Sequence, residues 1–492
     1  MKYKLIGILL TVSILVGSFA AYLAVKPVKT RVHQHLTASV PAKCSDHGDE
    51  RFCTHLPLVK IDTGGRKIPG KTIRDENKRK IGYETADDGS DRITADIRIN
   101  DRQGQRNHLE DAPTIESRIL IHIRGNSSRS FEKPGYAVEL ITEDGKKNPQ
   151  PVMGMDAHHE WVLHGSYIDK TLMRNYMWYN IGGEIMDYAP NVRFCEVFIN
   201  DSYEGVYVMT EKITAGENGA RLNLSVNKKD NSYTGYLLQL DKNVDNPFKE
   251  ADTFTGYALR RKHRLEICFP KTGSLTPELK RSIELDFSDF EKALYSYDFD
   301  SNEFGYRKLI DVDSFVDYFL INEFTCNYDA GWLSTYIYKD IDGRFRMCIW
   351  DFNSACDAYK HSYLNTDDFQ FTDCLWYWML VKDRTFTQRI IDRYRELRKT
   401  YFSEEYLEGY IDDVIDYLGD AVDRNFERWG HTFEVDYDVF TPRERNPRSY
   451  SEAVDAMKLF IRTRSENMDS NIESLNQFSA ESRVKKFIEN AN

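Results

Sequence analysis

The chain has 492 residues, of which 41% are apolar and 13% aromatic, so one to three domains with a large core are expected. This composition excludes a mainly disordered chain. The net charge of −12, with no long basic block after the first thirty residues, excludes duplex nucleic acid as the main partner. Any nucleotide would need a local site, with a metal ion to screen the carboxylates.

The first predicted element is the N-terminal segment, residues 1–30. Lys2 and Lys4 precede an apolar run over 5–25, and basic residues follow it. The run is long enough to cross a bilayer and longer than the usual core of a signal peptide, so an uncleaved anchor and a cleaved signal are both open. In either case we expect an extracytoplasmic protein, membrane-anchored or secreted, whose N-terminal segment contacts the membrane.

Residues 31–85 are predicted to form a stalk or linker. Cys44 and Cys53 in this polar segment suit a small disulfide loop outside the cell. The chain has eight cysteines but no CxxC pair, which argues against a zinc ribbon. Five histidines between His108 and His164 lack the HExxH spacing, so surface or hydrogen-bonded histidines are expected there.

A strand-rich region follows, from about residue 90 to residue 270. Alternating apolar residues or short apolar runs predict strands over 119–123, 136–141, 194–199 and 205–209, and the last two flank a turn and form a hairpin. A helix is predicted over 172–186, although two glycines weaken its end.

After about residue 275 the pattern becomes mainly helical. Apolar residues from Val312 to Phe324 have the spacing of one helix face, and Asp311 or Asp313 could cap its start. A hairpin follows, with strands over 335–339 and 344–350, and then helices over 386–400, 403–429 and 450–475. A strand-rich part followed by a helical part favours an α+β enzyme with two lobes and a cleft.

The stretch from Asp329 to Asp351 is the most informative about chemistry. Asp329 follows the predicted helix and Asp351 follows the hairpin, which can bring together two carboxylates that are 22 residues apart in the sequence. Two converging carboxylates suit a divalent metal ion together with a base. Phosphoryl transfer uses such a pair, since one carboxylate orients the acceptor hydroxyl and the other holds the metal. The alternative is two ordinary turn or capping residues.

A second segment of chemical interest joins two predicted strands and contains Arg124, Gly125, Asn126, Ser127 and Ser128, with Lys133 after it. Its backbone N–H groups and hydroxyls offer hydrogen-bond donors to phosphate, and Lys133 adds a positive charge. The segment contains neither a Walker motif nor a complete GxGxxG, so a solvated hairpin turn is the alternative.

Taken in order, these segments resemble the CotH kinase family, the spore coat protein H-like atypical protein kinases. The resemblance rests on Arg124–Ser128 with Lys133-Pro134, 161–170 with Arg174-Asn175, 196–211, 235–238, 327–329, 336–340 and 350–352. It covers roughly residues 90–470, so a kinase domain is predicted over 86–475 and a C-terminal tail over 476–492.

The resemblance implies a bilobal protein-kinase-like fold, with a strand-rich N-terminal lobe and a mainly helical C-terminal lobe. It implies ATP and Mg²⁺ or Mn²⁺ as cofactors, and phosphate transfer to Ser or Thr of secreted or coat proteins. Arg124–Ser128 would cover the phosphates, Lys133 would pair with them, and Glu211 would lie in a hinge near the adenine. Asp329 would orient the acceptor hydroxyl, and Asp351 would bind the metal.

The sequence departs from the family pattern at two metal positions. Ser334 stands where the family often has Asn, five residues after the catalytic aspartate, and Asn353 replaces the last Asp of the Asp-Phe-Asp motif. Both still offer an oxygen to metal, but without charge. Lys133 has no clear acidic partner, and Glu184 on the predicted helix is a candidate. A catalytically inactive surface or coat protein with a structural or adhesion role therefore stays an alternative, as does a metal-dependent hydrolase.

Overall fold

The computed structural model describes residues 31–44, 52–217, 219–228, 232–242, 247–248, 264–356, 367–434 and 446–479. The chain divides into two compact units, residues 1–33 and 34–492, and the described helices and strands belong to the second. The predicted N-terminal segment 1–30 and most of the predicted tail lie outside the described residues. In the described ranges, none of the helices combines the length and apolar character that crossing a membrane requires.

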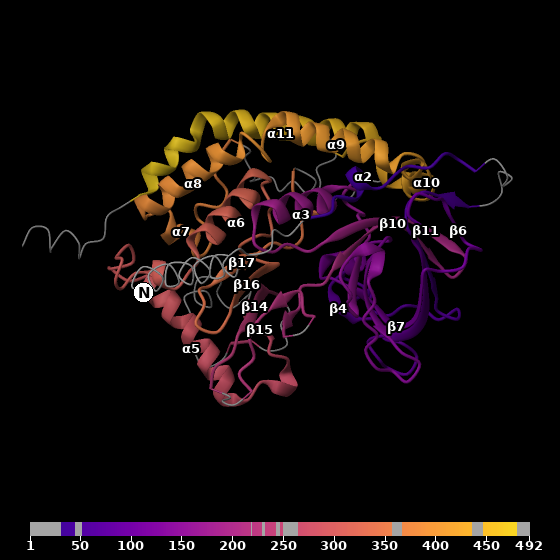
Figure 1. Ribbon diagram of the computed structural model, residues 1–492, viewed down its shortest axis with the longest axis horizontal. Helices are drawn as coiled ribbons and strands as arrows, with labels where there is room; N and C mark the ends of the chain where they lie inside the picture. Colours follow the sequence, from indigo (N-terminus) through magenta and orange to yellow (C-terminus); the bar gives the residue numbers. More distant parts are fainter. Residues whose placement is uncertain are drawn as a thin grey trace, which may run out of the picture. The chain divides into compact units, whose positions relative to one another are not determined.

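Strands and helices are both abundant, which agrees with the predicted α+β class. Seven of the described strands close into a barrel in the order β10-β11-β9-β8-β7-β5-β2. Figure 1 labels β7, β10 and β11 of this barrel. Their bounds are β2 (Leu58–Asp62), β5 (Ile93–Asn100), β7 (Ile115–Arg124), β8 (Gly135–Ile141), β9 (Glu160–His164), β10 (Val192–Ile199) and β11 (Ser202–Glu211). Neighbouring strands are antiparallel except β2 and β10, whose parallel pairing closes the barrel.

The barrel is filled by side chains from alternate strand positions, as the period of two requires. Ile119, Ile121 and Val138 are members of this buried cluster, which confirms the strands predicted over 119–123 and 136–141. The predicted hairpin is also confirmed, because β10 and β11 pair antiparallel. β10 is buried except at its last residue and β11 is buried from Gly205 onward, which explains the apolar run at the start of the buried part of β11.

The stalk predicted over 31–85 is wrong for its second half, because β2 is a strand of the barrel. Val59 and Ile61 are fully buried in the barrel cluster. Upstream, α2 (Gln34–Thr37) is also bound to the barrel, since the amide side chain of Gln34 accepts from Phe194 N–H and donates to its C=O at 2.7 and 3.2 Å. A five-residue strand between polar stretches carries little periodicity, so local patterns miss it.

Two small antiparallel sheets accompany the barrel. β1 (Cys53–Thr54) pairs with β6 (Asn107–His108), and β3 (Thr72–Arg74) pairs with β4 (Lys80–Tyr83). The parallel pair β12 (Ala215–Gly216) and β13 (Leu222–Asn223) follows β11.

A separate antiparallel sheet has the strand order β15-β14-β16-β17. The strands are β14 (Tyr236–Asp241), β15 (Arg264–Phe269), β16 (Thr335–Lys339) and β17 (Arg346–Cys348). The hairpin predicted after residue 335 is therefore confirmed as β16 and β17, and β14 extends it into a larger sheet. Side chains of α5 (Pro277–Leu294) pack on it, since Phe287 and Phe290 contact the ring of Phe345.

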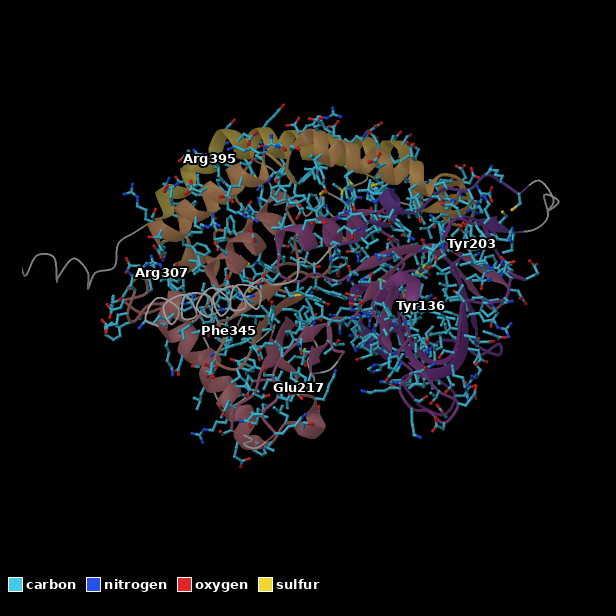
Figure 2. All side chains as sticks on the ribbon, viewed as in Figure 1. Tyr136, Tyr203, Glu217, Arg307, Phe345 and Arg395 are labelled. Carbon is cyan, nitrogen blue, oxygen red and sulfur yellow. The ribbon has the colours of Figure 1, made fainter. Side chains whose placement is uncertain are left out.

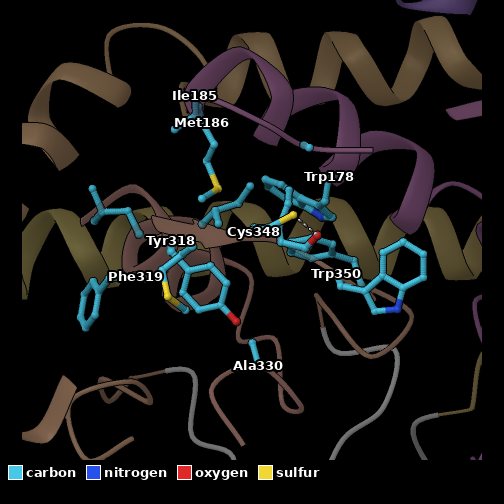
Figure 3. Packing of buried hydrophobic residues seen from close by; sticks show 14 of the residues in the cluster. Trp178, Ile185, Met186, Tyr318, Phe319, Ala330, Cys348 and Trp350 are labelled. Carbon is cyan, nitrogen blue, oxygen red and sulfur yellow. Dashed lines mark hydrogen bonds between the residues drawn. The ribbon is translucent and has the colours of Figure 1, made fainter. Parts of the chain in front are cut away.

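Two helices, α6 (Val312–Phe324) and α3 (Arg174–Ile185), share a buried cluster with this sheet. Of the two predicted caps, Asp311 is the one that begins α6, and its side chain accepts from Ser314 N–H at 3.1 Å. α3 confirms the helix predicted over 172–186. Figure 3 shows Trp178 of α3, Tyr318 of α6 and Trp350 after β17 in the same buried cluster. Figure 2 labels Phe345 of this cluster and Tyr136 of the barrel cluster.

The C-terminal part is helical, as predicted, and consists of α7 (Tyr377–Leu380), α8 (Arg384–Leu397), α9 (Glu404–Leu418), α10 (Asp420–Trp429) and α11 (Tyr450–Asn471). The single helix predicted over 403–429 is wrong, because Gly419 ends α9 with φ of 45°. A left-handed residue is the common way to end a helix, and glycine adopts it at little cost. The break lets α10 pack on β11, where Trp429 Nε1 donates to Glu204 C=O at 2.9 Å.

Candidate active site

A cavity of about 830 Å³ lies where the ends of several elements converge. Its walls come from the loop between β7 and β8, the ends of β9 and β14, the loop after α6, and the segment after β17. Ten predicted site residues line it, namely Arg124, Gly125, Asn126, Ser127, Ser128, Lys133, Asp329, Ser334, Asp351 and Asn353. The volume is in the range of pockets that hold small ligands and cofactors.

Asp329 lies at the cavity in the loop that follows α6. Its backbone C=O accepts from the N–H groups of Trp332 and Leu333, at 3.2 and 2.8 Å, so the loop turns sharply after it. Burial raises the pKa of Asp329 to about 7, and the charge of Asp351 is the second cause. A carboxylate with this pKa both takes up and releases a proton near neutral pH, which a general base requires.

Asp351 lies directly after the hairpin, in a backbone conformation that is rare outside glycine. Its φ is 61°, and its backbone is held on both sides. The N–H group of Asp351 donates to Tyr179 Oη at 2.9 Å, and its C=O accepts from Asn327 Nδ2 at 3.0 Å. Burial raises the pKa of the Asp351 carboxylate, while the hydrogen bond from Asn353 and the charge of Arg124 oppose this. The hairpin thus brings Asp329 and Asp351 to one cavity, as the sequence predicts.

The N-terminal turn of α3 holds the segment after Asp351. The side chain of Asn175 accepts from Phe352 N–H at 2.7 Å and donates to Asn353 Oδ1 at 2.8 Å. Arg174 donates to the C=O groups of Ala355 and Cys356, at 2.8 and 3.1 Å. This explains in physical terms why Arg174-Asn175 belongs to the motif set: both side chains fix the backbone that carries the metal-site candidates Asp351 and Asn353.

A third carboxylate, Asp241, lines the same cavity and was missed by the sequence reasoning. It ends β14, accepts from Asn126 Nδ2 at 3.0 Å and from Gln239 Nε2 at 3.0 Å, and its charge raises the pKa of both Asp329 and Asp351. The signal available in the sequence was an acidic residue at the end of an apolar strand. The carboxylates of Asp241, Asp329 and Asp351 line the cavity together with the amide oxygen of Asn353. These oxygen ligands form a donor set that suits Mg²⁺ or Mn²⁺.

The loop between β7 and β8 requires glycine at position 125. Gly125 has φ of 104°, and a Cβ atom there would lie 1.9 Å from Ser128 Oγ. Ser127–Ser130 forms a 3₁₀ turn, and Arg129 Nε donates back to Gly125 C=O at 2.6 Å. Arg124 enters the cavity beside Trp350, with its guanidinium carbon 5.4 Å from the ring centroid. The loop is therefore a rigid turn that carries a cation at its base.

Lys133 lines the cavity, but its ammonium group is bound to neutral acceptors. It donates to Val206 C=O at 2.7 Å and to Asn425 Oδ1 at 2.8 Å, which ties the loop to β11 and α10. Burial, with a smaller effect from the charge of Lys170, lowers the pKa of Lys133 to about 7. Glu184, the acidic partner suggested by the sequence, instead accepts a hydrogen bond from Tyr401 Oη at 3.4 Å.

Glu211 is the predicted site residue that does not line the cavity. It is buried at the end of β11, where it forms an ion pair with Arg221 at 3.0 Å. Its carboxylate also accepts from Asn191 N–H at 2.9 Å. The position expected for a hinge residue near adenine is thus occupied by an internal ion pair.

His164, at the end of β9, gives the cavity wall a pH-dependent stability. It is buried, its Nε2 atom has no hydrogen-bond partner among the described residues, and burial lowers its pKa to about 3. Between that value and its ordinary pKa of 6.5, the unfolded chain binds a proton that the folded chain does not. The contribution of His164 to folding stability therefore falls as the pH drops through 6.5.

Because of His164, the free energy of unfolding is expected to be about 2 kcal/mol lower at pH 5 than at pH 7, since one pKa unit corresponds to about 1.4 kcal/mol. Urea unfolding at both pH values should show that His164→Leu loses less stability on acidification than the wild-type chain, by about this amount. His431→Gln is the matched control, since His431 is exposed and should leave the difference unchanged. Equal losses in His164→Leu and wild type would contradict the assignment.

Comparison with known proteins finds a family that matches the region carrying these motifs. The CotH kinase protein family matches residues 121–468, which includes every predicted site residue. The chain is also 24% identical over 308 residues to inner spore coat protein H of Bacillus subtilis (strain 168), covering 60% of this chain and 74% of that protein. Since the family match spans more than half of the sequence, the chain belongs to the CotH kinase protein family.

Proposed function

We propose that the chain is a protein kinase that transfers phosphate from ATP to Ser or Thr side chains of coat or other extracytoplasmic proteins. The observation that carries this proposal is the convergence of Asp329, Asp351 and the Arg124–Ser128 loop on one cavity. A phosphoryl-transfer site needs a base for the acceptor hydroxyl, carboxylates for a metal and donors for phosphate oxygens. The barrel and the four-stranded sheet with its helices would then correspond to the two lobes of a kinase-like enzyme.

The proposed metal ligands are Asp351, Asn353 and Asp241. Bound Mg²⁺ or Mn²⁺ would neutralise the phosphate oxygens and the charge that develops on them. Asn353 retains acceptor capacity for this role, because its Oδ1 accepts one hydrogen bond, from Asn175, and an amide oxygen has two lone pairs. Ser334 also lines the cavity and would be a weaker ligand than an amide or carboxylate.

The remaining roles follow from charge and position. Asp329 would accept the proton of the acceptor hydroxyl, since its pKa of about 7 suits a base that works near neutrality. The N–H groups of the Arg124–Ser128 loop would bind phosphate oxygens, and Arg124 would neutralise their charge. Lys133 would act mainly by fixing this loop, because its ammonium group already has two acceptors.

The test is phosphate transfer by the purified full chain, with γ-labelled ATP, Mg²⁺ or Mn²⁺ and a Ser-rich acceptor protein. We expect label on the acceptor with the wild-type chain. Asp329→Asn should keep the rise in melting temperature that ATP and metal produce, yet lose about 10²- to 10⁴-fold in transfer rate, the usual contribution of a general base. Release of free phosphate without labelled protein would favour a metal-dependent hydrolase instead.

A structural coat protein is the second candidate, and Ser334 favours it because the second metal position lacks the family's Asn. The relative named inner spore coat protein H fits both candidates, and both place this chain in a coat or another extracytoplasmic location. The apolar run over 5–25 is proposed to anchor or export it. A chain that gains no thermal stability from ATP with metal, and transfers no phosphate, would support the structural role.

A further inference from the structure

A second cluster of metal-binding side chains lies outside the cavity, beside the small sheet of β1 and β6. Cys44, Cys53 and His108 place their ligand atoms within 4.8 Å of one another. His108 Nε2 is 3.6 Å from Cys44 Sγ. None of the three residues lines the cavity that holds Asp329 and Asp351.

The spacing of these atoms suits a tetrahedral metal centre. Zinc binds sulfur at about 2.3 Å and histidine nitrogen at about 2.0–2.1 Å, so sulfur and nitrogen ligands of one ion lie about 3.6 Å apart. The 3.6 Å between His108 Nε2 and Cys44 Sγ equals this separation. The disulfide expected between Cys44 and Cys53 is not formed, since all eight cysteines are described and none is in a disulfide. Cys44 and Cys53 therefore carry thiols, which bind a metal as thiolates.

The imidazole of His108 is oriented by a carboxylate. Its Nδ1 atom is 3.2 Å from Asp111 Oδ2, and the same carboxylate oxygen accepts from His108 N–H at 2.9 Å. Arg102 forms an ion pair with Asp111 at 3.2 Å and holds it in place. This arrangement fixes the tautomer in which Nδ1 carries the proton, so Nε2 presents its lone pair toward the cysteines. Metal-binding histidines in proteins commonly have such a carboxylate partner.

We propose that Cys44, Cys53 and His108 bind one Zn²⁺ ion, with Asp111 as a positioning residue. The ion would join the segment that leads from α2 to the β1–β6 pair, because Cys44 follows α2, Cys53 begins β1 and His108 ends β6. Neighbouring contacts already hold this segment in place. Lys43 pairs with Asp420 at 2.8 Å, and Arg106 Nε donates to Pro41 C=O at 3.2 Å. The metal would thus fix the start of the folded unit to the barrel.

The test measures zinc bound to the full chain, purified under reducing conditions, incubated with Zn²⁺ and dialysed. We expect one zinc per chain by elemental analysis. Cys44→Ser and His108→Gln should each lower the bound zinc at least tenfold, and Asp111→Asn should weaken zinc affinity about 10- to 100-fold. Cys268→Ser and His431→Gln are controls that should bind zinc as the wild type does. Circular dichroism of each variant separates loss of the site from loss of the fold.

Cobalt provides an independent readout. A Co²⁺-loaded chain should absorb in the near ultraviolet through thiolate-to-metal charge transfer, and Cys44→Ser or Cys53→Ser should reduce that band while His431→Gln does not. The proposal is overturned if the reduced, folded chain binds no zinc, or if the variants bind as much as the wild type. It is also overturned if the chain isolated without reductant carries a Cys44–Cys53 disulfide and takes up no zinc after reduction. None of these outcomes depends on kinase activity.

Discussion

Asp351→Asn is expected to lower the rate of phosphate transfer by about 10³-fold, because a metal ion contributes several kcal/mol to the transition state and each 1.4 kcal/mol changes a rate tenfold. The amide keeps the size of the side chain but removes its charge, so metal binding is weakened without opening a cavity. The measurement is single-turnover transfer of labelled phosphate to an acceptor protein with Mg²⁺ or Mn²⁺.

The same substitution should leave the fold intact in the absence of metal. The backbone of Asp351 is held by Tyr179 and Asn327 through groups that the substitution does not touch. The carboxylate itself is unfavourable in the metal-free chain, because burial raises its pKa and the charge of Asp241 adds to this. The melting temperature of Asp351→Asn without metal is therefore expected at or above that of the wild type.

Asp413→Asn is the matched control for this prediction. Asp413 is an exposed aspartate on α9, and its loss should change neither the rate nor the melting temperature. A second comparison separates the two site aspartates. Asp351→Asn should lose the thermal stabilisation by ATP with metal, whereas Asp329→Asn should retain it. Wild-type rates in Asp351→Asn would refute the proposed metal role.

Local structure in this chain follows largely from local sequence. α6 and the β16–β17 hairpin are encoded by spacing and turn residues within about 40 positions, and both have nearly the predicted bounds. The cap of α6, Asp311, is one of the two that the sequence predicts. The convergence of Asp329 and Asp351 follows from the hairpin geometry alone. This is why the two residues most important for the proposed chemistry could be found without a structure.

Long-range pairing is what the sequence does not reveal. β2 joins β5 on one side and β10 on the other, and no local pattern specifies partners so far along the chain. Asp241 reaches the cavity only because β14 pairs with β16. Lys133 and Glu211 are buried by contacts with Asn425 and Arg221, which a motif does not indicate. A motif therefore predicts the role of a charged residue least well where the buried partner of that residue comes from a distant element.

The second large effect, on folding stability, is expected at the buried ion pair of Glu323 and Arg464. Glu323 lies in the last turn of α6 and Arg464 lies on α11, and both side chains are at most 1% exposed. The Glu323 carboxylate also accepts from the N–H groups of Gln370 and Phe371, at 2.9 and 2.7 Å. Since Gln370 and Phe371 line the cavity, the pair holds one of its walls.

Arg464→Met should destabilise the chain by about 3–5 kcal/mol, because it leaves the Glu323 carboxylate buried without its counter-charge. Burial already raises the pKa of Glu323, and the charge of Arg464 opposes that shift. The measurement is urea unfolding at pH 7. Arg395→Met is the matched control, because Arg395 pairs with Glu473 at the surface, where both side chains are more than half exposed (Figure 2). Its effect should stay within about 1 kcal/mol.

The double variant Glu323→Gln with Arg464→Met distinguishes loss of the ion pair from loss of packing. Glu323→Gln removes the unpaired buried charge and keeps one oxygen to accept from either Gln370 or Phe371, whose N–H groups bind different carboxylate oxygens. The double variant should therefore recover part of the stability lost in Arg464→Met. If the double variant is no more stable than Arg464→Met, the loss arises from the packing of the long arginine side chain rather than from an unpaired buried charge. Recovery of stability together with ATP-dependent stabilisation would link this pair to the integrity of the cavity wall.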